Sequence, residues 1–365
     1  MQKILFVSGS LSQNGTEMFM MNVLHNIDRK HFHIDFCIFD TEITPNRIEA
    51  EKLGCKVYTL PSRRKNPLKN VLAQFKFFHA HSNEYNAIHW HGGNLSSFFG
   101  FILYRFFGIP IRIVHAHSSC AVGLHNKILH NFHRLFVRRC CTHCLACSSE
   151  SAKFFFRSSP AIIIKNGIDV KMFGYDKIVR EKVRVELGIN QGDVVIGHVG
   201  RFDDNKNQTF LLDIFFEYIK SNPNSYLLLV GNGETLDDMK KKAQELCIYD
   251  KVIFTGVRCD VNHLMQAMDC FVMPSKFEGL PFVLVEAQCS GLPCVISDSI
   301  NQDVNITGNV HFVSLSSDAQ NWSLIINNVL LNTTRESKAN VIIKKGFSIT
   351  DTVSTLQDIY SNKTD

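Results

Sequence analysis

Short apolar runs that alternate with longer helical patterns constrain the fold of this chain more than any other feature. Thirteen such runs read as strands, and in both halves of the chain they end on small or polar residues. They lie at residues 3–8, 33–39, 56–60, 87–90, 112–115, 143–147, 161–164, 194–199, 226–230, 252–255, 270–274, 293–296 and 310–313. This alternation is typical of βαβ units around a parallel sheet, so the sequence predicts an α/β fold. Open α/β sheets bind ligands outside the carboxyl ends of their strands, so functional residues are expected there.

The length of 365 residues and the two series of strands predict two domains. We expect a first Rossmann-like domain at residues 1–175 and a second at residues 176–345. The turn at residues 166–169 precedes a charged helix and lies near the expected boundary. Residues 346–365 should form a C-terminal helix, which could cross back to the first domain. With 45% hydrophobic and 20% charged residues, the chain has apolar material for two cores.

No apolar stretch is long enough to cross a membrane. The longest, residues 98–107, is interrupted by Arg105 and is about half of the ~20 residues that a span requires. Met1 runs almost directly into the first predicted strand, without the pattern of a signal peptide. We therefore expect a cytoplasmic protein whose twelve cysteines are reduced thiols.

The formal charge is distributed unevenly along the chain. Residues 1–190 hold 25 Lys and Arg against 13 Asp and Glu, a balance of +12, whereas residues 191–365 hold 14 against 21, a balance of −7. A basic half joined to an acidic half predicts that the first half meets something anionic, such as nucleic acid, a membrane surface or a phosphorylated lipid. The alternative is drift in surface charge.

One basic stretch has helical spacing. Residues 127–139 mix apolar side chains with six basic or titratable ones, and the cluster Arg63, Arg64 and Lys65 precedes them in the sequence. Such a helix could rest on an anionic membrane surface. It could equally cover the core and expose a solvated basic face.

The stretch at residues 277–286 combines two acids with a tight turn. Glu278 precedes a Gly-Leu-Pro turn, Pro281 suits the opening of a helix, and Glu286 lies inside that helix. Free backbone amides at the start of a helix form an anion site. Here they would belong to Phe282, Val283 and Leu284. Carboxylates beside an anion site suit a ligand that carries both phosphate and hydroxyl groups, such as a phosphorylated sugar.

Basic residues follow the first strand of the second half. Arg201 and Lys206 come after the strand at residues 194–199 and could clamp two adjacent phosphates. They could instead be solvated surface charges. The next strand leads into a turn that contains Gly231 and Gly233, which is weak support for a ligand because turns need glycine in any case.

The first half contains a similar loop and a pair of histidines. Gly15 and Thr16 lie between the first strand and a helix, but the loop lacks the G-x-G-x-x-G of a dinucleotide site, so they more plausibly approach a phosphate or sugar. His115 and His117 share one face of a strand end, and His117 emerges where a ligand would bind. The alternative is a satisfied core histidine. The segment from His89 to His91 has the same pattern with weaker support.

The cysteine-rich run at residues 140–147 resembles an iron–sulfur motif but lacks the next cysteine of that pattern. A zinc site would need a second ligand pair, and none is evident elsewhere. Residues 143–147 also fit a buried strand, in which cysteine behaves as a small apolar residue. We therefore predict no metal site.

Taken together, Glu278 and Glu286 at E-x7-E spacing, Arg201 with Lys206, His117 and the loop around Gly15 resemble the family-4 retaining glycosyltransferases of the GT-B fold. The likeness is greatest to the capsule and exopolysaccharide branch and covers nearly the whole chain. Many relatives have Gly-Gly in the first loop, where this chain has Asn14 and Gly15. The resemblance implies two facing Rossmann-like domains with a ligand cleft between them, an acceptor domain first and a nucleotide-sugar donor domain second.

The resemblance also implies roles for single residues. Arg201 and Lys206 would bind the donor diphosphate, Glu286 the ribose and Glu278 the transferred sugar. His117 would lie by that sugar and the acceptor. The remaining donor contacts would come from Gly15, Thr16, Gly233, Val257, Arg258, Phe282, Val283 and Leu284. No metal or other cofactor would be needed, because cations and helix amides neutralise the leaving diphosphate, and no nucleic acid would be a partner.

The predicted function is therefore transfer of a hexose-type sugar, expected from a UDP-sugar, to a glycan acceptor carried on a lipid diphosphate at the inner membrane face. An epimerase of nucleotide sugars with the same fold is an alternative. A second alternative is a non-catalytic subunit that binds nucleotide sugars. A dehydrogenase is disfavoured because the dinucleotide fingerprint is missing.

Overall fold

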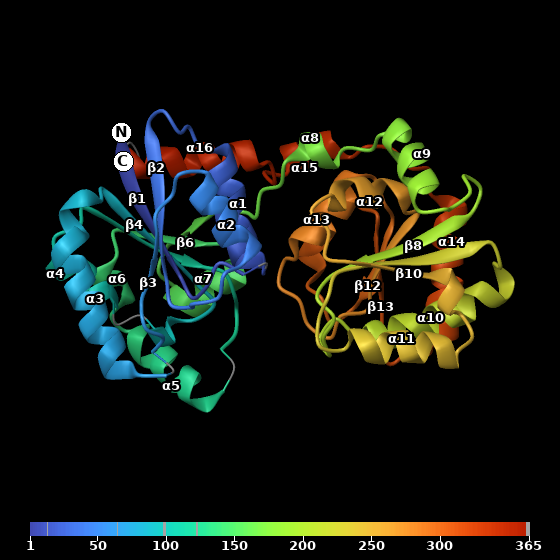
Figure 1. Ribbon diagram of the computed structural model, residues 1–365, viewed down its shortest axis with the longest axis horizontal. Coiled ribbons are helices and arrows are strands. Elements are labelled where there is room, and N and C mark those ends of the chain that lie inside the picture. The colour runs from blue at the N-terminus through green and yellow to red at the C-terminus, as the bar shows by residue number, and fades with distance from the viewer. Residues whose placement is uncertain (13, 64, 98–99, 122, 363–365) are drawn as a thin grey trace. The chain divides into compact units, whose positions relative to one another are not determined.

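The computed structural model describes residues 1–362 except 13, 64, 98–99 and 122. Arg64 of the predicted basic cluster, the first two residues of the stretch 98–107 and the last three residues of the chain lie outside the described residues. The chain divides into two compact units. The first comprises residues 1–167 and 349–365, and the second comprises residues 168–348. Each unit is a parallel sheet covered by helices on both faces (Figure 1).

The first unit is built on a seven-stranded sheet in the order β3-β2-β1-β4-β5-β6-β7. Its strands are β1 Gln2–Ser8, β2 Phe32–Ile38, β3 Val57–Thr59, β4 Ala87–Gly92, β5 Ile111–Ala116, β6 His143–Ala146 and β7 Ile162–Ile163. Its helices are α1 Gly15–Asn26, α2 Pro45–Lys52, α3 Pro67–His81, α4 Gly100–Phe106, α5 Leu124–His133, α6 Val137–Cys140, α7 Ser149–Phe156 and α16 Ile349–Tyr360, with short 3-10 turns η1 Ser82–Glu84 and η2 Leu95–Ser97.

The second unit is built on a six-stranded sheet in the order β10-β9-β8-β11-β12-β13. Its strands are β8 Val194–Val199, β9 Ser225–Val230, β10 Val252–Gly256, β11 Cys270–Met273, β12 Cys294–Ser297 and β13 Val310–Val313. Its helices are α8 Val170–Phe173, α9 Lys177–Glu186, α10 Gln208–Ser221, α11 Leu236–Glu245, α12 Val261–Ala267, α13 Phe282–Cys289, α14 Ala319–Asn332 and α15 Ala339–Lys344, with 3-10 turns η3 Tyr249–Lys251 and η4 Gln302–Val304.

All thirteen predicted strands form, with ends that differ by at most two residues. The central strands are buried on both faces, as parallel sheets require, whereas Ile162 and Ile163 of the edge strand β7 are exposed. In β11, for example, Val272 packs into the core on one face of the sheet, and Phe271 and Met273 pack into the core on the other. Residues 143–146 of the cysteine-rich run form the strand β6, and Cys144 and Cys147 are buried.

The boundary between the units differs from the predicted one. It lies after Gly167 rather than after residue 175, because residues 170–176 are bonded to α12 of the second unit. The amide of Asp176 donates to Gln266 Oε1 at 3.0 Å, and Gln266 Nε2 donates to the carbonyl of Gly174 at 3.3 Å. At the other end, α16 packs on α1 and so belongs to the first unit.

Both sheets have a point at which the strand order reverses. In the first unit β1 lies between β2 and β4, and in the second unit β8 lies between β9 and β11. The loops that leave the carboxyl ends of such strand pairs diverge and leave a crevice, which is where open α/β sheets bind ligands. Among the described helices, none has both the length and the hydropathy that a membrane span requires.

Candidate active site

The crevice of the second unit contains an ion pair. Lys206 follows β8, Glu278 follows β11, and Lys206 Nζ lies 2.6 Å from Glu278 Oε1. Both side chains are largely buried, at 16% and 13% exposure. Two further bonds connect these loops: the amide of Lys276 donates to the carbonyl of Asn205, and Asn205 Nδ2 donates to the carbonyl of Phe277, both at 2.8 Å. The structure thus brings together two residues that the sequence analysis assigned to different parts of a ligand.

Arg201 lies in the same loop as Lys206 and is more exposed to solvent. It follows β8 directly, and its Nη2 donates to Glu234 Oε1 at 3.0 Å. Both side chains are exposed to solvent. An exposed ion pair of this kind contributes only ~0–1 kcal/mol, so Arg201 can exchange its partner for a ligand phosphate at little cost.

The start of α13 provides backbone donors, but fewer than predicted. Pro281 is the N-cap rather than the first helical residue, and the helix begins at Phe282. The amide of Leu284 donates to the carbonyl of Pro281 at 3.1 Å, so the prediction that it is free is wrong. The turn tightens at the start of the helix and uses that donor. Within the described residues the amides of Phe282 and Val283 have no partner, and they remain available to an anion.

Glu286 is a half-buried carboxylate four residues into α13. Burial raises the pKa of Glu286 to about 7. No described residue forms a hydrogen bond or ion pair with this carboxylate. A carboxylate in such surroundings is a candidate for contact with a ligand that donates hydrogen bonds, such as a sugar hydroxyl.

Of the other predicted donor contacts of the second unit, Gly233 and Arg258 have structural explanations that involve no ligand. A side chain at Gly233 would place its Cβ within 2.1 Å of the carbonyl oxygen of Phe202, so glycine is needed there for packing. Arg258 donates to both carboxylate oxygens of Asp260, at 2.7 and 2.6 Å. Val257 follows β10 and is exposed. Neither the structure nor the chemistry of these three residues tests their predicted roles.

Four histidines form an array on one face of the first sheet. His89 and His91 lie on β4, and His115 and His117 lie on β5 or directly after it. His89 Nε2 lies 3.2 Å from His115 Nδ1, and His91 Nδ1 lies 3.0 Å from His117 Nε2. The hydroxyl of Tyr360 on α16 lies 2.6 Å from His89 Nδ1. Phe19 packs edge-on against His115 and so covers part of this array.

The histidine array is uncharged at neutral pH. Burial holds the pKa of His89, His91 and His115 well below the usual value and lowers the pKa of His117 to about 3. The Nε2 atoms of His91 and His115 are buried and have no partner among the described residues. Nitrogen atoms of His89, His91 and His115 lie within 4.8 Å of one another, the spacing of a possible metal site. The prediction that this protein needs no metal therefore stays a prediction.

The loop between β1 and α1 contains Gly15 and Thr16 at the start of α1. The next residue, Glu17, is buried, and its Oε1 accepts a hydrogen bond from Ser10 Oγ at 2.8 Å. The sequence analysis assigned no role to Glu17. The structure records no contact that tests the predicted roles of Gly15 and Thr16.

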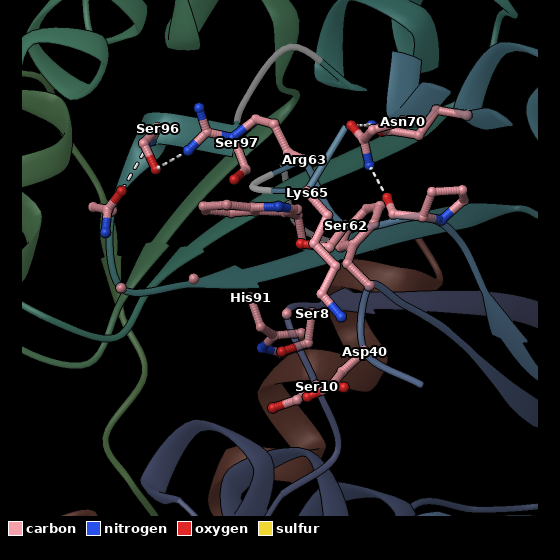
Figure 2. A pocket seen from close by; sticks show the side chains of 18 of the residues that line it. Ser8, Ser10, Asp40, Ser62, Arg63, Lys65, Asn70, His91, Ser96 and Ser97 are labelled. Atoms are coloured by element: carbon pink, nitrogen blue, oxygen red, sulfur yellow. Dashed lines mark hydrogen bonds between the residues drawn. The ribbon is translucent and has the colours of Figure 1, made fainter. Parts of the chain in front are cut away.

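A pocket of about 740 Å³ opens at the carboxyl ends of β1 to β4. Figure 2 shows Arg63, Ser96 and Ser97 along one side of it, and Ser8, Ser10, Asp40 and His91 along the other. Arg63 Nη2 donates to Ser96 Oγ at 3.3 Å. The charged lining comprises three cations and one carboxylate within the described residues: Arg63, Lys65, Lys69 and Asp40.

The sequence analysis did not predict this pocket. It singled out His117, whereas the described lining contains His91 and not His117. The available signal was a set of polar residues after four successive strands, among them Ser10, Asp40, Ser62 and Asn94. Their convergence depends on the strand order β2-β1-β4, which the sequence does not reveal.

Comparison with known proteins identifies the family. A family model described as "Glycosyl transferases group 1" matches residues 179–347. The whole chain is 30% identical to the "Putative glycosyltransferase EpsF" of Bacillus subtilis (strain 168), in a match that covers 97% of that protein. The chain belongs to the group 1 glycosyltransferases. The relatives of this glycosyltransferase also include the "Vi polysaccharide biosynthesis protein VipC/TviE" of Salmonella typhi, at 37% identity over 28% of the chain and 18% of that protein.

Two further matches bear on the fold and the chemistry. An Escherichia coli protein named "UDP-Gal:alpha-D-GlcNAc-diphosphoundecaprenol alpha-1,3-galactosyltransferase" is 25% identical over 80% of this glycosyltransferase and 79% of its own length. The crystal structure of Anabaena Alr3699/HepE in complex with UDP superposes with a TM-score of 0.80 at 20% identity, covering 99% of this glycosyltransferase and 100% of that chain. The predicted α/β fold of GT-B type and the resemblance to polysaccharide-synthesising glycosyltransferases are confirmed.

Proposed function

We propose that this glycosyltransferase moves a hexose-type sugar, with retention of configuration and without a metal, from a UDP-sugar to a glycan acceptor on a lipid diphosphate. The pathway would be synthesis of a capsular polysaccharide, an exopolysaccharide or an O-antigen. The observation that carries the proposal is the pairing of Lys206 with Glu278 beside the first amides of α13, in the crevice of the second unit. It combines a cation for phosphate, a carboxylate for sugar hydroxyls and free backbone donors.

The donor would replace contacts that the protein makes with itself. A diphosphate would take up Lys206, Arg201 and the amides of Phe282 and Val283, all of which favour negative charge. Glu278 would then be free to accept hydrogen bonds from hydroxyls of the transferred sugar. The carboxylate of Glu286, which has no partner within the described residues, would accept hydrogen bonds from the ribose.

The transfer step breaks the bond between the anomeric carbon of the sugar and the phosphate oxygen, and forms a bond from that carbon to an acceptor oxygen. The acceptor hydroxyl loses its proton to an oxygen of the leaving diphosphate on the same face, so no residue is assigned as nucleophile or general base. Charge accumulates on the diphosphate as its bond breaks. Lys206, Arg201 and the α13 amides would stabilise that charge, and one donor at such a site is typically worth ~3 kcal/mol of barrier.

Two relatives support the choice of substrates. The Anabaena structures were solved with UDP and with UDP-glucose, and the Escherichia coli relative is named for a galactosyl donor and a lipid diphosphate acceptor. In the first unit, the pocket lined by Arg63, Lys65 and Lys69 offers cations for an acceptor diphosphate. Such an acceptor would place the protein at the inner membrane face. The roles implied for Gly15, Thr16, Gly233, Val257, Arg258 and His117 stay predictions.

Calorimetry and donor turnover test this proposal together. UDP should bind to the purified protein in the presence of a metal chelator, and incubation of a UDP-sugar with a lipid diphosphate acceptor should yield a longer glycan. Conversion of the donor to another sugar with no acceptor present would show an epimerase instead. Binding of UDP-sugars without transfer to any acceptor would indicate a non-catalytic subunit, and absence of UDP binding would refute the donor assignment.

A further inference from the structure

Helix α5 exposes its apolar side chains instead of burying them. Leu124, Ile128 and Phe132 are 76%, 60% and 56% exposed, and their spacing of four residues places them on one face of the helix. Leu135 and Phe136, directly after the helix, extend the exposed apolar surface. We call these five residues the outer face of α5. Ordinary surface helices turn such a stripe toward the core, so the arrangement requires an explanation.

The inner side of α5 is held by polar bonds. His130 is buried, its Nδ1 accepts from the amide of Leu95 at 3.1 Å, and its Nε2 donates to the carbonyl of Phe154 at 3.1 Å. His133 Nδ1 donates to the carbonyl of Leu95 at 2.7 Å. These bonds fix the rotation of the helix about its axis. The apolar side chains therefore face outward because the histidines bind inward.

The part of the sequence that contains this helix is strongly basic. Residues 52–149 contain thirteen Lys and Arg and one acid, Glu84, which accounts for the whole excess of +12 in residues 1–190. Three of these cations, Lys127, Arg138 and Arg139, lie on or just after α5 and are exposed. An exposed apolar stripe on a helix with basic neighbours is the pattern of a segment that lies in the interface of an anionic bilayer.

The same helix contributes to the pocket of the first unit. Asn126, between Leu124 and Ile128, lines that pocket together with Lys65 and Lys69. If α5 lay on a bilayer, the pocket would lie close to the membrane surface. The head group of a lipid in that bilayer could then contact Lys65 and Lys69 while its lipid tail stayed in the membrane.

We propose that the outer face of α5 docks on an anionic bilayer and so presents the pocket to the head group of a membrane-bound acceptor. This inference rests on the proposed lipid-linked acceptor. A second copy of the chain or another protein would also cover apolar side chains, but neither would account for the exposed cations of Lys127, Arg138 and Arg139 beside them. The bilayer is therefore the occupant that the observations favour.

Flotation with lipid vesicles tests this proposal on the full chain. The wild-type protein should float with vesicles of phosphatidylcholine and phosphatidylglycerol and bind much less to phosphatidylcholine alone. The double variant Ile128→Ser and Phe132→Ser should reduce the bound fraction at least about tenfold, because two apolar side chains lose their lipid contact. The matched control is Leu331→Ser on α14 of the second unit, at 78% exposure, which should float like the wild type.

Both altered side chains are exposed, so the double variant should keep the wild-type melting temperature. Equal flotation of the double variant and the wild type would overturn the proposal, as would wild-type binding that does not depend on phosphatidylglycerol. A dimer in analytical ultracentrifugation that the double variant abolishes would overturn it in favour of a second copy. Wild-type protein that binds UDP but no vesicles would refute this inference and leave the proposed donor chemistry intact.

Discussion

The two sheets reverse their strand order in the same way, but different side chains follow their strands. In the second unit the crevice between β8 and β11 contains the ion pair of Lys206 and Glu278 beside free helix amides. In the first unit the strands β4 and β5 present buried histidines, and the pocket beside them is lined by polar side chains and by the cations of Arg63, Lys65 and Lys69. The parallel sheet decides where ligands bind, and the side chains after the strands decide which ligands bind. In the proposed function the second unit binds the diphosphate of the donor, and the pocket of the first unit binds the head group of the acceptor.

The largest expected effect comes from removing the cation of the charged crevice. Lys206→Ala should lower turnover by roughly 10²–10³-fold, because one donor to the leaving diphosphate is lost and the largely buried Glu278 is left without its partner. Steady-state kinetics with a UDP-sugar measures this. The matched control is Lys242→Ala, since Lys242 pairs with Asp213 at 2.6 Å in the same unit but outside the crevice. Wild-type turnover in Lys206→Ala would refute the assignment of this crevice.

The next effect concerns Glu286. Glu286→Gln keeps the shape but removes the charged acceptor, so UDP affinity at pH 8 should fall by ~1.5–3 kcal/mol. The pKa of Glu286 is about 7, and the ionised form is the better acceptor for ribose hydroxyls. Wild-type affinity should therefore fall as the pH decreases from 8 to 6. Calorimetry at several pH values measures the UDP affinity of the wild type and of the variant. The variant serves as a control, because its pH dependence includes the titration of UDP but not that of Glu286. An equal pH dependence in wild type and variant would contradict the ribose role.

A decrease in pH should lower the stability of the first unit more than that of the second unit. The pKa of each histidine in the array lies below its value of about 6.5 in the unfolded chain, so the unfolded state binds more protons below that pH. Stability is therefore full above pH 6.5 and falls as the pH decreases, by up to ~1.4 kcal/mol per pH unit for each histidine. The second unit has one comparable group among its described residues, His198, whose pKa burial lowers to about 4.

Denaturant unfolding between pH 5 and 7.5 checks this difference. His115→Asn should remove up to one proton from the pH dependence of stability, even though it destabilises the unit at neutral pH. His25→Asn is the control, because His25 is exposed in an ion pair with Glu49. An unchanged slope in His115→Asn would show that the array does not govern the acid sensitivity.

The smallest effect on stability is expected at Arg201. Arg201→Ala should change the free energy of unfolding by no more than about 0.5 kcal/mol, since its ion pair with Glu234 is exposed. UDP affinity should nevertheless decrease about tenfold with the loss of a charge-assisted contact. Glu234→Ala, which frees Arg201 without removing it, should bind UDP at least as tightly as the wild type. A loss of affinity in Glu234→Ala would show that the acid itself contributes to binding.

Predictions that rested on the periodicity of many residues were confirmed, whereas two that rested on single residues differ from the structure. The thirteen strands follow from local periodicity, and so does the parallel α/β architecture. The boundary after Gly167 differs by eight residues from the predicted one, because the hydrogen bonds of Gln266 with Gly174 and Asp176 come from a helix about ninety residues away. The amide of Leu284 is used inside its own turn, a detail of helix geometry that a sequence pattern does not specify.

The sequence by itself determined the elements, the family and the candidate residues at the strand ends, since these depend on short-range periodicity and on motifs within a few residues. Only the tertiary structure decided which candidates meet. Lys206 and Glu278 are 72 positions apart and form an ion pair because β8 and β11 are neighbours. His89 and His115 meet because β4 and β5 pair in a given register, and Tyr360 reaches them because α16 returns to the first unit. Strand order, strand register and the packing of α16 on the first unit depend on residues far apart in the sequence. The arrangement of side chains at the ends of both sheets depends on these properties.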